Sequence, residues 1–233
     1  MRNNFQTTQP KLLLTKIPFL PMRPKFFVGT EGISVELVAY TPQPDKVIAE
    51  SASISHSSKF KKLDENKVKY LINLLKKLGH ESVFEHASFT FKIEGISRVC
   101  THQLVRHRIA SYTQQSQRYV LLKDIEFIVP EDVQKSKFLD EFIEIAERAY
   151  ELYRKMVRSG IKKEDARYIL PHGVSTKIVV TMNARELRHF FKLRCEKDAQ
   201  WEIRTLAIKM LEKCYEVAPI TFEDLYRKYV IGE

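Results

Sequence analysis

Residues 106–119, RHRIASYTQQSQRY, are polar along almost their whole length, and the elements on either side of them define the fold. The stretch holds three arginines and one histidine, with serine, threonine and glutamine between them. So little apolar surface predicts that it does not pack as core. The planar donor fork of arginine matches phosphate and carboxylate groups, so the composition indicates a site for an anion or a nucleotide. A solvated basic loop is the alternative, because charged runs usually face water.

Length and composition predict an ordinary globular protein. The chain has 233 residues, 44% of them hydrophobic and 29% charged, which is enough to bury a core without disulfides. No apolar run approaches the roughly 20 residues that span a bilayer, and the start lacks the features of a secretory signal. We therefore expect a cytoplasmic protein with no membrane partner. The net charge of +10 suits a nucleic acid, a phosphorylated metabolite or an acidic cofactor equally well.

The three cysteines, Cys100, Cys195 and Cys214, form no CxxC pair. An odd number without that spacing argues against a disulfide framework and against a zinc site built on thiolates. Histidines and glutamates gather at residues 80–86, but their spacing is not the HExxH that places two imidazoles on one helical face. We therefore expect no metal.

The chain before the polar stretch predicts an arm followed by alternating elements. Residues 1–30 contain four prolines and several Asn and Gln, which is typical of an extended or partly disordered arm. We expect one folded domain over residues 31–233. Within it, residues 33–40 have strand composition, and residues 45–55 are typical of a helix.

The next elements have clearer boundaries. Asp64 caps a helix whose apolar residues recur every three or four positions, and Gly79 ends it. Residues 89–93 alternate apolar and polar side chains, as a half-buried strand does. Ser97 then caps a helix, predicted over residues 97–108, that leads into the polar stretch.

Downstream, residues 126–130 predict a short strand and residues 133–159 the longest helix. The helix carries apolar residues at steps of three and four, a packing surface for the core or for another subunit. These are Phe138, Phe142, Ile145, Ala149, Leu152 and Met156.

The last third predicts one more strand between helices. A short helix at residues 162–170 is stopped by Pro171, and residues 174–182 have the β-branched composition of a strand. Asn183 caps the helical remainder, which runs to about residue 217 and again over residues 222–229. Strands and helices without an internal repeat predict a single α+β domain.

The polar stretch carries a resemblance to a known family. The pattern R-H-R-x-x-S-x-x-x-x-S-x-R at residues 106–118 resembles the signature of flavin-dependent thymidylate synthases at every fixed position. Further segments resemble that family in order and spacing: GHESVFEH at 79–86, ARYILP at 166–171, NAR at 183–185, LR at 193–194 and AQWE at 199–202. The resemblance covers about residues 32–230.

The resemblance implies a fold and a reaction. The fold is a central, mainly antiparallel sheet flanked by long helices, and the reaction is the reductive methylation of dUMP to dTMP. Methylenetetrahydrofolate is the carbon donor, FAD and NADPH supply the reducing power, and no cysteine nucleophile takes part. The family forms homotetramers with active sites shared between subunits, which gives the striped helix a role at an interface.

The resemblance also implies site residues. It places dUMP against Gln103, Arg106, Gln114, Gln115, Ser116, Gln117, Arg118, Arg167 and Arg194. It places FAD against Ser55, His80, Ser82, Arg106, His107, Arg108, Gln114, Asn183, Arg185 and His189. The serine at 55 is open to a shift of two residues, to Ser53 or Ser57. Arg194 is the residue to which we assign catalysis, because a guanidinium beside the uracil ring stabilises its negative charge.

Two of these residues, Gln114 and Ser116, need a separate comment. Gln114 stands where many members of the family have glutamate, so a neutral group replaces a negative one near the pyrimidine. Ser116 has no evident general base beside it, so a hydrogen bond to dUMP is its expected role.

Two alternatives remain open from the sequence. The first is a basic nucleic-acid-binding module, supported by the net charge and by arginines interspersed with tyrosines. The second is a thymidylate synthase in which Cys195 is the nucleophile, because Arg188 and Arg194 nearby would lower the pKa of a thiol.

Overall fold

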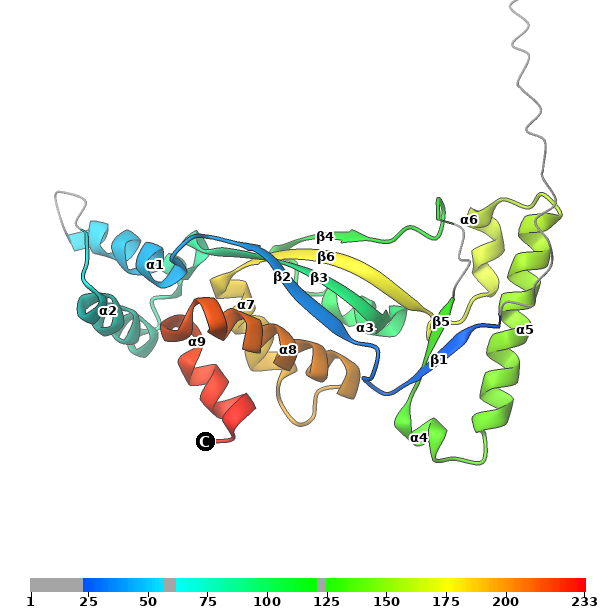
Figure 1. Cartoon of the computed structure of the whole chain (residues 1–233). Helices are drawn as coiled ribbons and strands as arrows, with labels where there is room; N and C mark the ends of the chain where they lie inside the picture. The colour runs from blue at the N-terminus through cyan, green and yellow to red at the C-terminus, as the bar shows by residue number, and fades with distance from the viewer. Residues whose placement is uncertain (1–22, 57–61, 121–124) are drawn as a thin grey trace, which may run out of the picture.

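A four-stranded sheet forms the centre of the computed structural model, which describes residues 23–56, 62–120 and 125–233 (Figure 1). Its strands lie in the order β2–β3–β6–β4, and every neighbouring pair is antiparallel. Their bounds are Ser34–Tyr40 for β2, Ser88–Ser97 for β3, Ser175–Asn183 for β6 and Ala110–Gln114 for β4. The predicted α+β class and the antiparallel sheet are confirmed.

Helices cover one face and one end of this sheet. In Figure 1, α7, α8 and α9 lie along one side of the sheet, while α1 and α2 lie at its left end. The bounds are α1 Pro44–Ser53, α2 Glu65–Leu78, α3 Arg98–Leu104, α7 Ala184–Arg194, α8 Trp201–Val217 and α9 Pro219–Tyr226. Short turns of 3-10 helix are η1 Ile54–His56, η2 Glu81–His86 and η3 Arg167–Ile169, and a π-turn, η4 Arg227–Ile231, follows α9.

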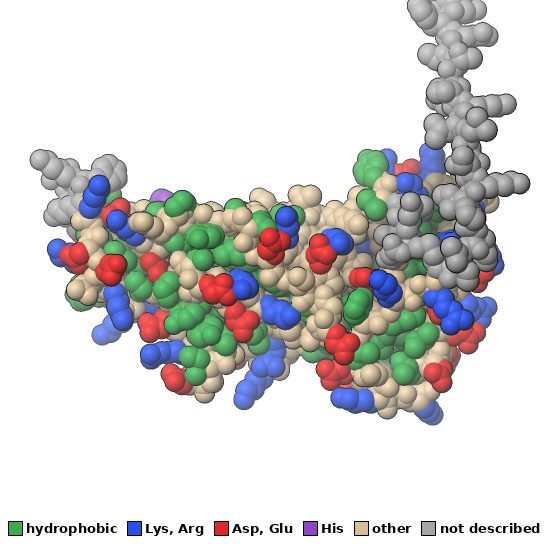
Figure 2. Space-filling model, in the orientation of Figure 1, with side chains coloured by type: hydrophobic (Ala, Val, Ile, Leu, Met, Phe, Trp, Pro, Cys, Tyr) green, Lys and Arg blue, Asp and Glu red, His purple; other side chains and the backbone are tan. Residues whose placement is uncertain are grey.

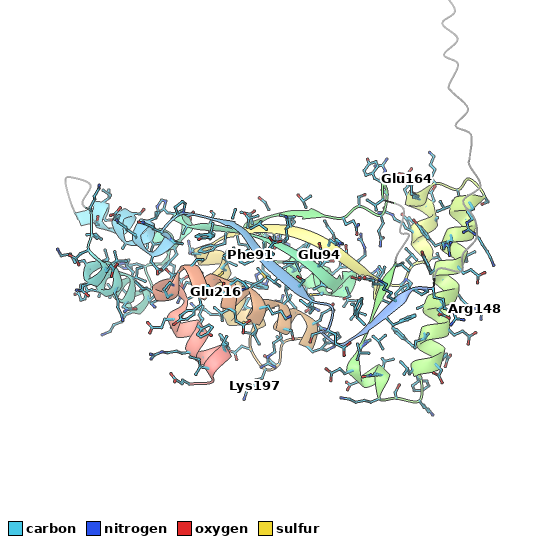
Figure 3. The ribbon with its side chains drawn as sticks, viewed as in Figure 1. Phe91, Glu94, Arg148, Glu164, Lys197 and Glu216 are labelled. Atoms are coloured by element: carbon cyan, nitrogen blue, oxygen red, sulfur yellow. The ribbon has the colours of Figure 1, made fainter. Side chains whose placement is uncertain are left out.

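The main core lies between the sheet and these helices. Phe89, Phe91 and Ile93 of β3 are fully buried, whereas the residues between them are partly or fully exposed. The alternation seen in the sequence therefore places the apolar side of β3 against the helices. Figure 3 shows Phe91 at the middle of the sheet.

The predicted helix caps are confirmed. The Asp64 side chain accepts a hydrogen bond from the Lys67 backbone N–H, and Gly79 ends α2 with a φ of 69°. Ser97 Oγ accepts from the Cys100 N–H at 3.0 Å, and Asn183 Oδ1 does the same for Glu186. Asp64, Ser97 and Asn183 each satisfy an N–H that the first turn of a helix leaves without a partner.

A smaller sheet and core form the other end of the molecule. Strands β1 Lys25–Val28 and β5 Glu126–Val129 pair in parallel, and α4 Glu131–Gln134, α5 Leu139–Arg158 and α6 Lys163–Ala166 surround them. Phe26 stacks on Phe127 with ring centroids 5.8 Å apart. Residues 25–28, at the end of the predicted arm over residues 1–30, are apolar enough to pair as a strand. Residues 1–22 lie outside the described residues.

Three predicted helices differ in their bounds. The helix predicted over 133–159 begins at Leu139, because the Ser136 hydroxyl donates to the Val133 carbonyl and accepts the Phe138 N–H, which interrupts the helical pattern. The helix predicted from 184 to 217 is two helices, and Gln200 caps the second by accepting from two backbone N–H groups. The helix predicted over 97–108 ends at Leu104.

One glycine is required by the sheet. Gly95 lies at a bulge in β3 with a φ of 73°, and a Cβ there would lie 1.8 Å from the Gly32 carbonyl oxygen. Only glycine allows that approach of β3 to the turn before β2. Among the described residues, no helix is long and apolar enough to cross a membrane.

Candidate active site

The polar stretch turns back on the helix that precedes it. After α3, residues 110–114 form β4, the edge strand of the sheet, with Tyr112 opposite Val180 of β6. The Tyr112 hydroxyl lies 2.9 Å from the Leu104 carbonyl oxygen and 2.8 Å from that of His107. Of the stretch predicted not to pack as core, these five residues form an edge strand in which Ser111 and Thr113 are exposed, while Ala110 and Tyr112 are partly buried against the main core.

At the start of the stretch, His107 lies between Glu186 and Arg194. Its Nδ1 is 3.2 Å from Glu186 Oε1, and the Arg194 Nε–H donates to its Nε2 at 3.2 Å. Glu186 lies in the first turn of α7 and Arg194 is its last residue. His107 and Glu186 are buried, at 5% and 6% exposure, so one helix supplies both partners of a buried imidazole.

Burial sets the charges in this group. It lowers the pKa of His107 to about 4, helped by the nearby charges of Arg194 and His189. It also raises the pKa of Glu186, against the opposing effect of His189 and Arg185. The imidazole is therefore neutral near pH 7, and its contact with Glu186 is a hydrogen bond to a neutral ring rather than a salt bridge.

At the end of the stretch, the side chains are more exposed and held differently. Arg118 pairs with Glu164 of α6, and the Arg167 Nε–H donates to the Glu164 carbonyl oxygen at 3.1 Å. Figure 3 shows Glu164 on this side of the molecule. Arg98 of α3 donates to the Gln115 carbonyl oxygen at 3.3 Å.

Positive charge at this end lacks full compensation. Burial, together with the nearby charge of Arg167, lowers the pKa of Arg98. The buried Nε of Arg98 has no hydrogen-bond partner among the described residues. Two neighbouring guanidinium groups with an unused donor suit a bound anion.

The remaining predicted dUMP residues lie on α3 and β4 and in the segments that follow them. The Gln114 amide donates to Thr101 Oγ1 and Thr176 Oγ1, both at 3.3 Å, and the Gln103 amide lies 3.5 Å from Gln200. Ser116 Oγ accepts from the Arg118 N–H. Gln117 is buried, while Arg106 is exposed.

The predicted FAD residues other than Gln114, the last residue of β4, form a second group at the other end of that strand. His80 and Ser82 lie in and before η2, Arg185 and His189 lie on α7, and all four side chains are exposed. Asn183 caps α7, Ser55 is exposed in η1, and Arg108 is exposed before β4. The group thus comes from η1, η2, α7 and the segment before β4.

The chemistry of this second group suits an anionic cofactor. The acidic side chains beside it are already paired: Arg185 donates to Glu85 at 2.5 Å, and Lys192 donates to Glu81 at 3.2 Å. The histidine and serine side chains remain as donors beside the N-terminus of α7, an 11-residue helix. Such a donor set fits the diphosphate of FAD.

The structure therefore brings the predicted residues together in two groups rather than one. His107 and Arg194 are in direct contact, close to the predicted FAD residues of α7. Arg118 and Arg167 lie beyond the far end of β4, and among the described residues no hydrogen bond or ion pair joins them to Arg194. A strand of five residues spans about 17 Å, so the two groups are at opposite ends of an extended site.

Cys195 does not have the environment of a nucleophile. Its side chain is 1% exposed, and burial raises the pKa of its thiol to about 12. The thiolate that attacks carbon in nucleophilic catalysis is therefore disfavoured. Cys100 and Cys214 are also free and buried, as expected from the sequence.

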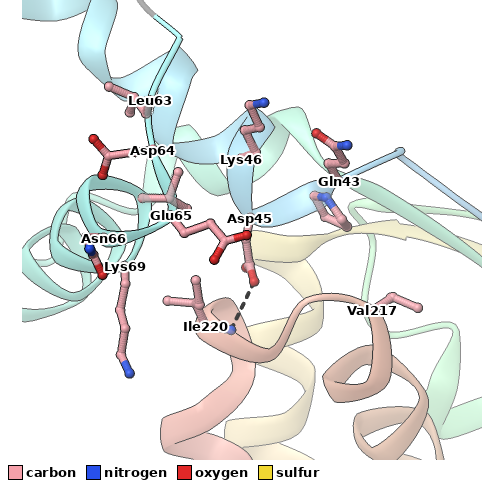
Figure 4. Close-up of a pocket in the computed structure, with 12 residues that line it drawn as sticks. Gln43, Asp45, Lys46, Leu63, Asp64, Glu65, Asn66, Lys69, Val217 and Ile220 are labelled. Atoms are coloured by element: carbon pink, nitrogen blue, oxygen red, sulfur yellow. Dashed lines mark hydrogen bonds between the residues drawn. The ribbon is translucent and has the colours of Figure 1, made fainter.

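A large hollow lies elsewhere and contains none of the predicted site residues. It measures about 770 Å³ and is lined by the starts of α1, α2 and α9, with Asp45, Asp64 and Lys69 among its walls (Figure 4). The Asp45 carboxylate accepts hydrogen bonds from the Ile220 and Thr221 N–H groups. Asp45 therefore serves as the N-terminal cap of α9.

Comparison with known proteins decides the family. The family model described as thymidylate synthase complementing protein matches residues 36–220. The chain belongs to this family. A flavin-dependent thymidylate synthase from Pyrococcus horikoshii is 52% identical over 201 residues, 81% of this chain and 83% of that protein. One from Clostridium tetani is 45% identical over 216 residues, 83% of this chain and 87% of that protein.

A solved structure supports the same family fold. The crystal structure of a UMP/dUMP methylase, PolB from Streptomyces cacaoi, bound with 5-Br dUMP, superposes with a TM-score of 0.77. It is 26% identical and covers 87% of this chain and 97% of its own.

Three residues beside the candidate site were not predicted from the sequence. Glu186 lies three residues after the Asn183 cap, where an acidic side chain commonly stabilises the start of a helix. The sequence therefore provided no reason to predict its contact with His107. Tyr112 was not among the predicted site residues. Glu202 accepts two hydrogen bonds from Ser97 at 2.6 Å, and its only signal was the AQWE match.

The face of the molecule shown in Figure 2 gives little support to a nucleic-acid-binding module. Figure 2 shows acidic and basic side chains interspersed over the face it presents, rather than a basic stripe. Nucleic-acid-binding domains gather Lys and Arg on one face or along one helix.

Proposed function

We propose that the chain catalyses the reductive methylation of dUMP to dTMP, with methylenetetrahydrofolate as carbon donor and FAD and NADPH as the source of reducing equivalents. The observation that carries the proposal is Arg194, held by a buried histidine of the RHR signature in a chain of the thymidylate synthase complementing protein family. Two further findings support it: the relatives are named flavin-dependent thymidylate synthases, and the similar solved structure is that of a UMP/dUMP methylase.

Arg194 provides the electrostatic contribution to the reaction. Methylation at C5 of uracil requires electron density at that carbon, which rises as N3 loses its proton. A guanidinium beside N3 and O2 stabilises the resulting negative charge, as oxyanion-hole donors do in other enzymes. With Cys195 buried and its thiol protonated, this route needs no covalent adduct with a cysteine.

The arginines at the far end of β4 bind the phosphate of dUMP. Arg118 and Arg167 present donors near the polar segment Gln115–Arg118, and Ser116 adds a hydroxyl there. Their role is to hold C5 of the uracil ring close to the carbon donor. Holding the two reactants in position lowers the entropic part of the activation barrier.

FAD is held at the other group, by residues of η1, η2 and α7. His80, Ser82 and His189 would supply donors to its diphosphate, with Arg185, Ser55, Asn183 and Arg106–Arg108 beside them. When bound and reduced, the flavin would supply the hydride that completes the methyl group. The protein contributes orientation and fixed charge.

A homotetramer with shared sites accounts for the separation of the two groups. Half of the predicted apolar stripe is exposed: Phe138, the N-cap of α5, and Ile145 and Leu152 on the helix are 56%, 57% and 45% exposed, while Met156 packs against the smaller core. A groove of about 470 Å³ runs beside this stripe, lined by Ile145, Ala149, Leu152, Ile169 and Pro171 among others. An apolar helix face of this kind is suited to burial against another copy.

The direct test of the proposed function is spectroscopic and chemical. The purified protein is expected to be yellow, to release FAD on denaturation, and to form dTMP from dUMP only with both NADPH and methylenetetrahydrofolate present. A colourless protein that neither binds added FAD nor oxidises NADPH contradicts the proposal. A nucleic-acid-binding module would instead bind DNA or RNA with steep salt dependence.

The oligomeric state is tested separately. Ile145→Glu and Leu152→Glu place charges on the outward stripe of α5 and are expected to convert a tetramer to smaller species in light scattering. Glu147→Gln on the same helix is the control. A tetramer that survives both substitutions excludes this surface as the interface.

A further inference from the structure

We infer that Glu186 is a positioning residue for Arg194, acting through His107, which it holds in one tautomer and one orientation. The inference rests on the proposed function, in which Arg194 stabilises charge on the uracil ring. It concerns a carboxylate to which neither the motif nor the family resemblance assigned a role.

The direction of each hydrogen bond follows from the chemistry of arginine. A guanidinium has only donors and keeps its charge in proteins, so the Arg194 Nε–H must donate to His107 Nε2. A neutral imidazole that accepts at Nε2 carries its proton at Nδ1. That proton points to Glu186 Oε1, 3.2 Å away, so a carboxylate, an imidazole and a guanidinium form one directed chain.

The alternative states of His107 break this chain. An imidazolium has no acceptor left for Arg194, and the Nε2–H tautomer places a donor against a donor. The low pKa of His107 keeps the ring neutral, and Glu186 selects the Nδ1–H tautomer by accepting that proton. The group that receives the Arg194 bond is therefore fixed before substrate binds.

Neighbouring side chains hold the imidazole in place. Phe190 contacts it edge-on, with ring centroids 4.8 Å apart and planes at 89°. Tyr112 of β4 lies 2.8 Å from the His107 carbonyl oxygen, which fixes the backbone. The other ionisable groups nearby, Arg185 and His189, lie on α7 with Glu186.

These contacts fix the plane of the Arg194 guanidinium and leave its Nη donors free to bind a ligand. Its Nε is engaged, while its two Nη groups have no hydrogen-bond partner among the residues that the structure describes. Because a guanidinium is planar, one bond at Nε together with the side chain sets the direction of the remaining donors. Glu186 and His107 thus aim the Nη edge of Arg194 without touching the substrate.

The test is a double-mutant cycle on turnover. Glu186→Met removes the acceptor and is expected to lower kcat for dTMP formation roughly 30-fold, the usual scale for losing a supporting hydrogen bond. FAD content and the dissociation constant for dUMP should stay within about threefold, since ground-state uracil is neutral. Glu186→Gln, whose amide oxygen still accepts the Nδ1–H bond, should recover most of the loss. Glu196→Gln, a carboxylate two residues beyond Arg194 that pairs with Lys228, is the matched control.

The decisive comparison is made in the absence of Arg194. In an Arg194→Ala background, Glu186→Met should cause no further loss, because a residue that acts through Arg194 has nothing left to position. Additive losses would show a general structural role and overturn the inference. Unchanged kcat in Glu186→Met would overturn it as well.

A measurement without turnover separates this inference from the proposed function. Histidine-selective ¹⁵N NMR, assigned with His107→Gln, should show His107 as the Nδ1–H tautomer in the wild type and not in Glu186→Met. An Nε2–H tautomer or an imidazolium at pH 7 in the wild type overturns the inference whether or not the protein forms dTMP. A wild type with the Nδ1–H tautomer but no dTMP formation contradicts the proposed function alone.

Discussion

The two ends of the signature stretch differ in how their side chains are held. At the first end, His107 is buried and bonded on both ring nitrogens, to Glu186 and to Arg194. At the second end, Arg118 is exposed, and Arg98 and Arg167 lie near one another with an unused buried donor on Arg98. At the first end, both ring nitrogens of His107 have partners within the chain. At the second end, positive charge exceeds the negative charge that the chain supplies.

This difference separates two tasks of an active site. Electrostatic stabilisation of a transition state needs groups that are oriented before the reaction, and the first end has that property. Binding of an anionic substrate needs positive charge whose partner arrives with the substrate, and the second end has that property. We therefore assign turnover to the first end and dUMP binding to the second.

The largest expected effect is at Arg194. Arg194→Ala removes the donor that stabilises the ionised ring, and turnover is expected to fall roughly 1,000-fold, as for loss of an oxyanion-hole donor. The protein should keep its FAD, because Arg194 is not among the residues that hold it. Steady-state dTMP formation measures this, with Arg227→Ala, an exposed arginine after α9, as the control. Unimpaired turnover would remove the catalytic role of Arg194.

A different pattern is expected at the other end. Arg167→Met removes a phosphate contact, so KM for dUMP should rise roughly 30-fold, as for a charged hydrogen bond, while kcat stays nearly constant. Initial rates across dUMP concentrations measure both constants. Lys213→Met removes an exposed charge that pairs with Glu216 and should change neither. A fall in kcat at constant KM would assign Arg167 to the turnover end.

Acid should weaken the first end through His107. Its pKa is about 4 in the folded protein, against an ordinary value of 6.5, so the unfolded chain binds this proton first as pH falls. The neutral ring contributes in full to the free energy of unfolding above pH 6.5, and this contribution is lost as pH falls toward 4. About 2 kcal/mol of it is lost by pH 5. Denaturant unfolding at pH 7 and pH 5 should show this difference in the wild type and not in His107→Gln. Equal losses in the two proteins would exclude His107 as the group responsible.

The smallest effect is expected at Cys195. Cys195→Ala should leave turnover within about threefold of the wild type, because the buried, protonated thiol takes no part in the chemistry. Cys100→Ala, at a second buried thiol, controls for loss of packing. Loss of all turnover in Cys195→Ala alone would restore the cysteine-nucleophile mechanism.

Local signals in the sequence predicted much of the fold. Caps at Asp64, Ser97 and Asn183, and the alternation in β3, depend on neighbouring residues and were found where expected. The strand at residues 25–28 was missed because prolines precede it closely, and its pairing with β5 joins segments about 100 residues apart.

The site was predictable as a list of residues but not as an arrangement. The motif and its companion segments named His107 and Arg194, yet their contact depends on how α7 packs beside the loop after α3. Glu186 was hidden by its second role at a helix start, and Tyr112 by its apolar ring. Spacing along a chain does not determine which polar groups meet across a fold.

The dissociation constant for dUMP, measured by flavin absorbance in Glu186→Gln, Glu186→Met and Arg167→Met, tests the division of tasks most directly. We expect binding within about threefold of the wild type in both Glu186 variants, because the neutral ring in the ground state needs no stabilisation. We expect roughly 30-fold weaker binding in Arg167→Met, from loss of a charged hydrogen bond. Weak binding in the Glu186 variants together with normal binding in Arg167→Met would contradict it.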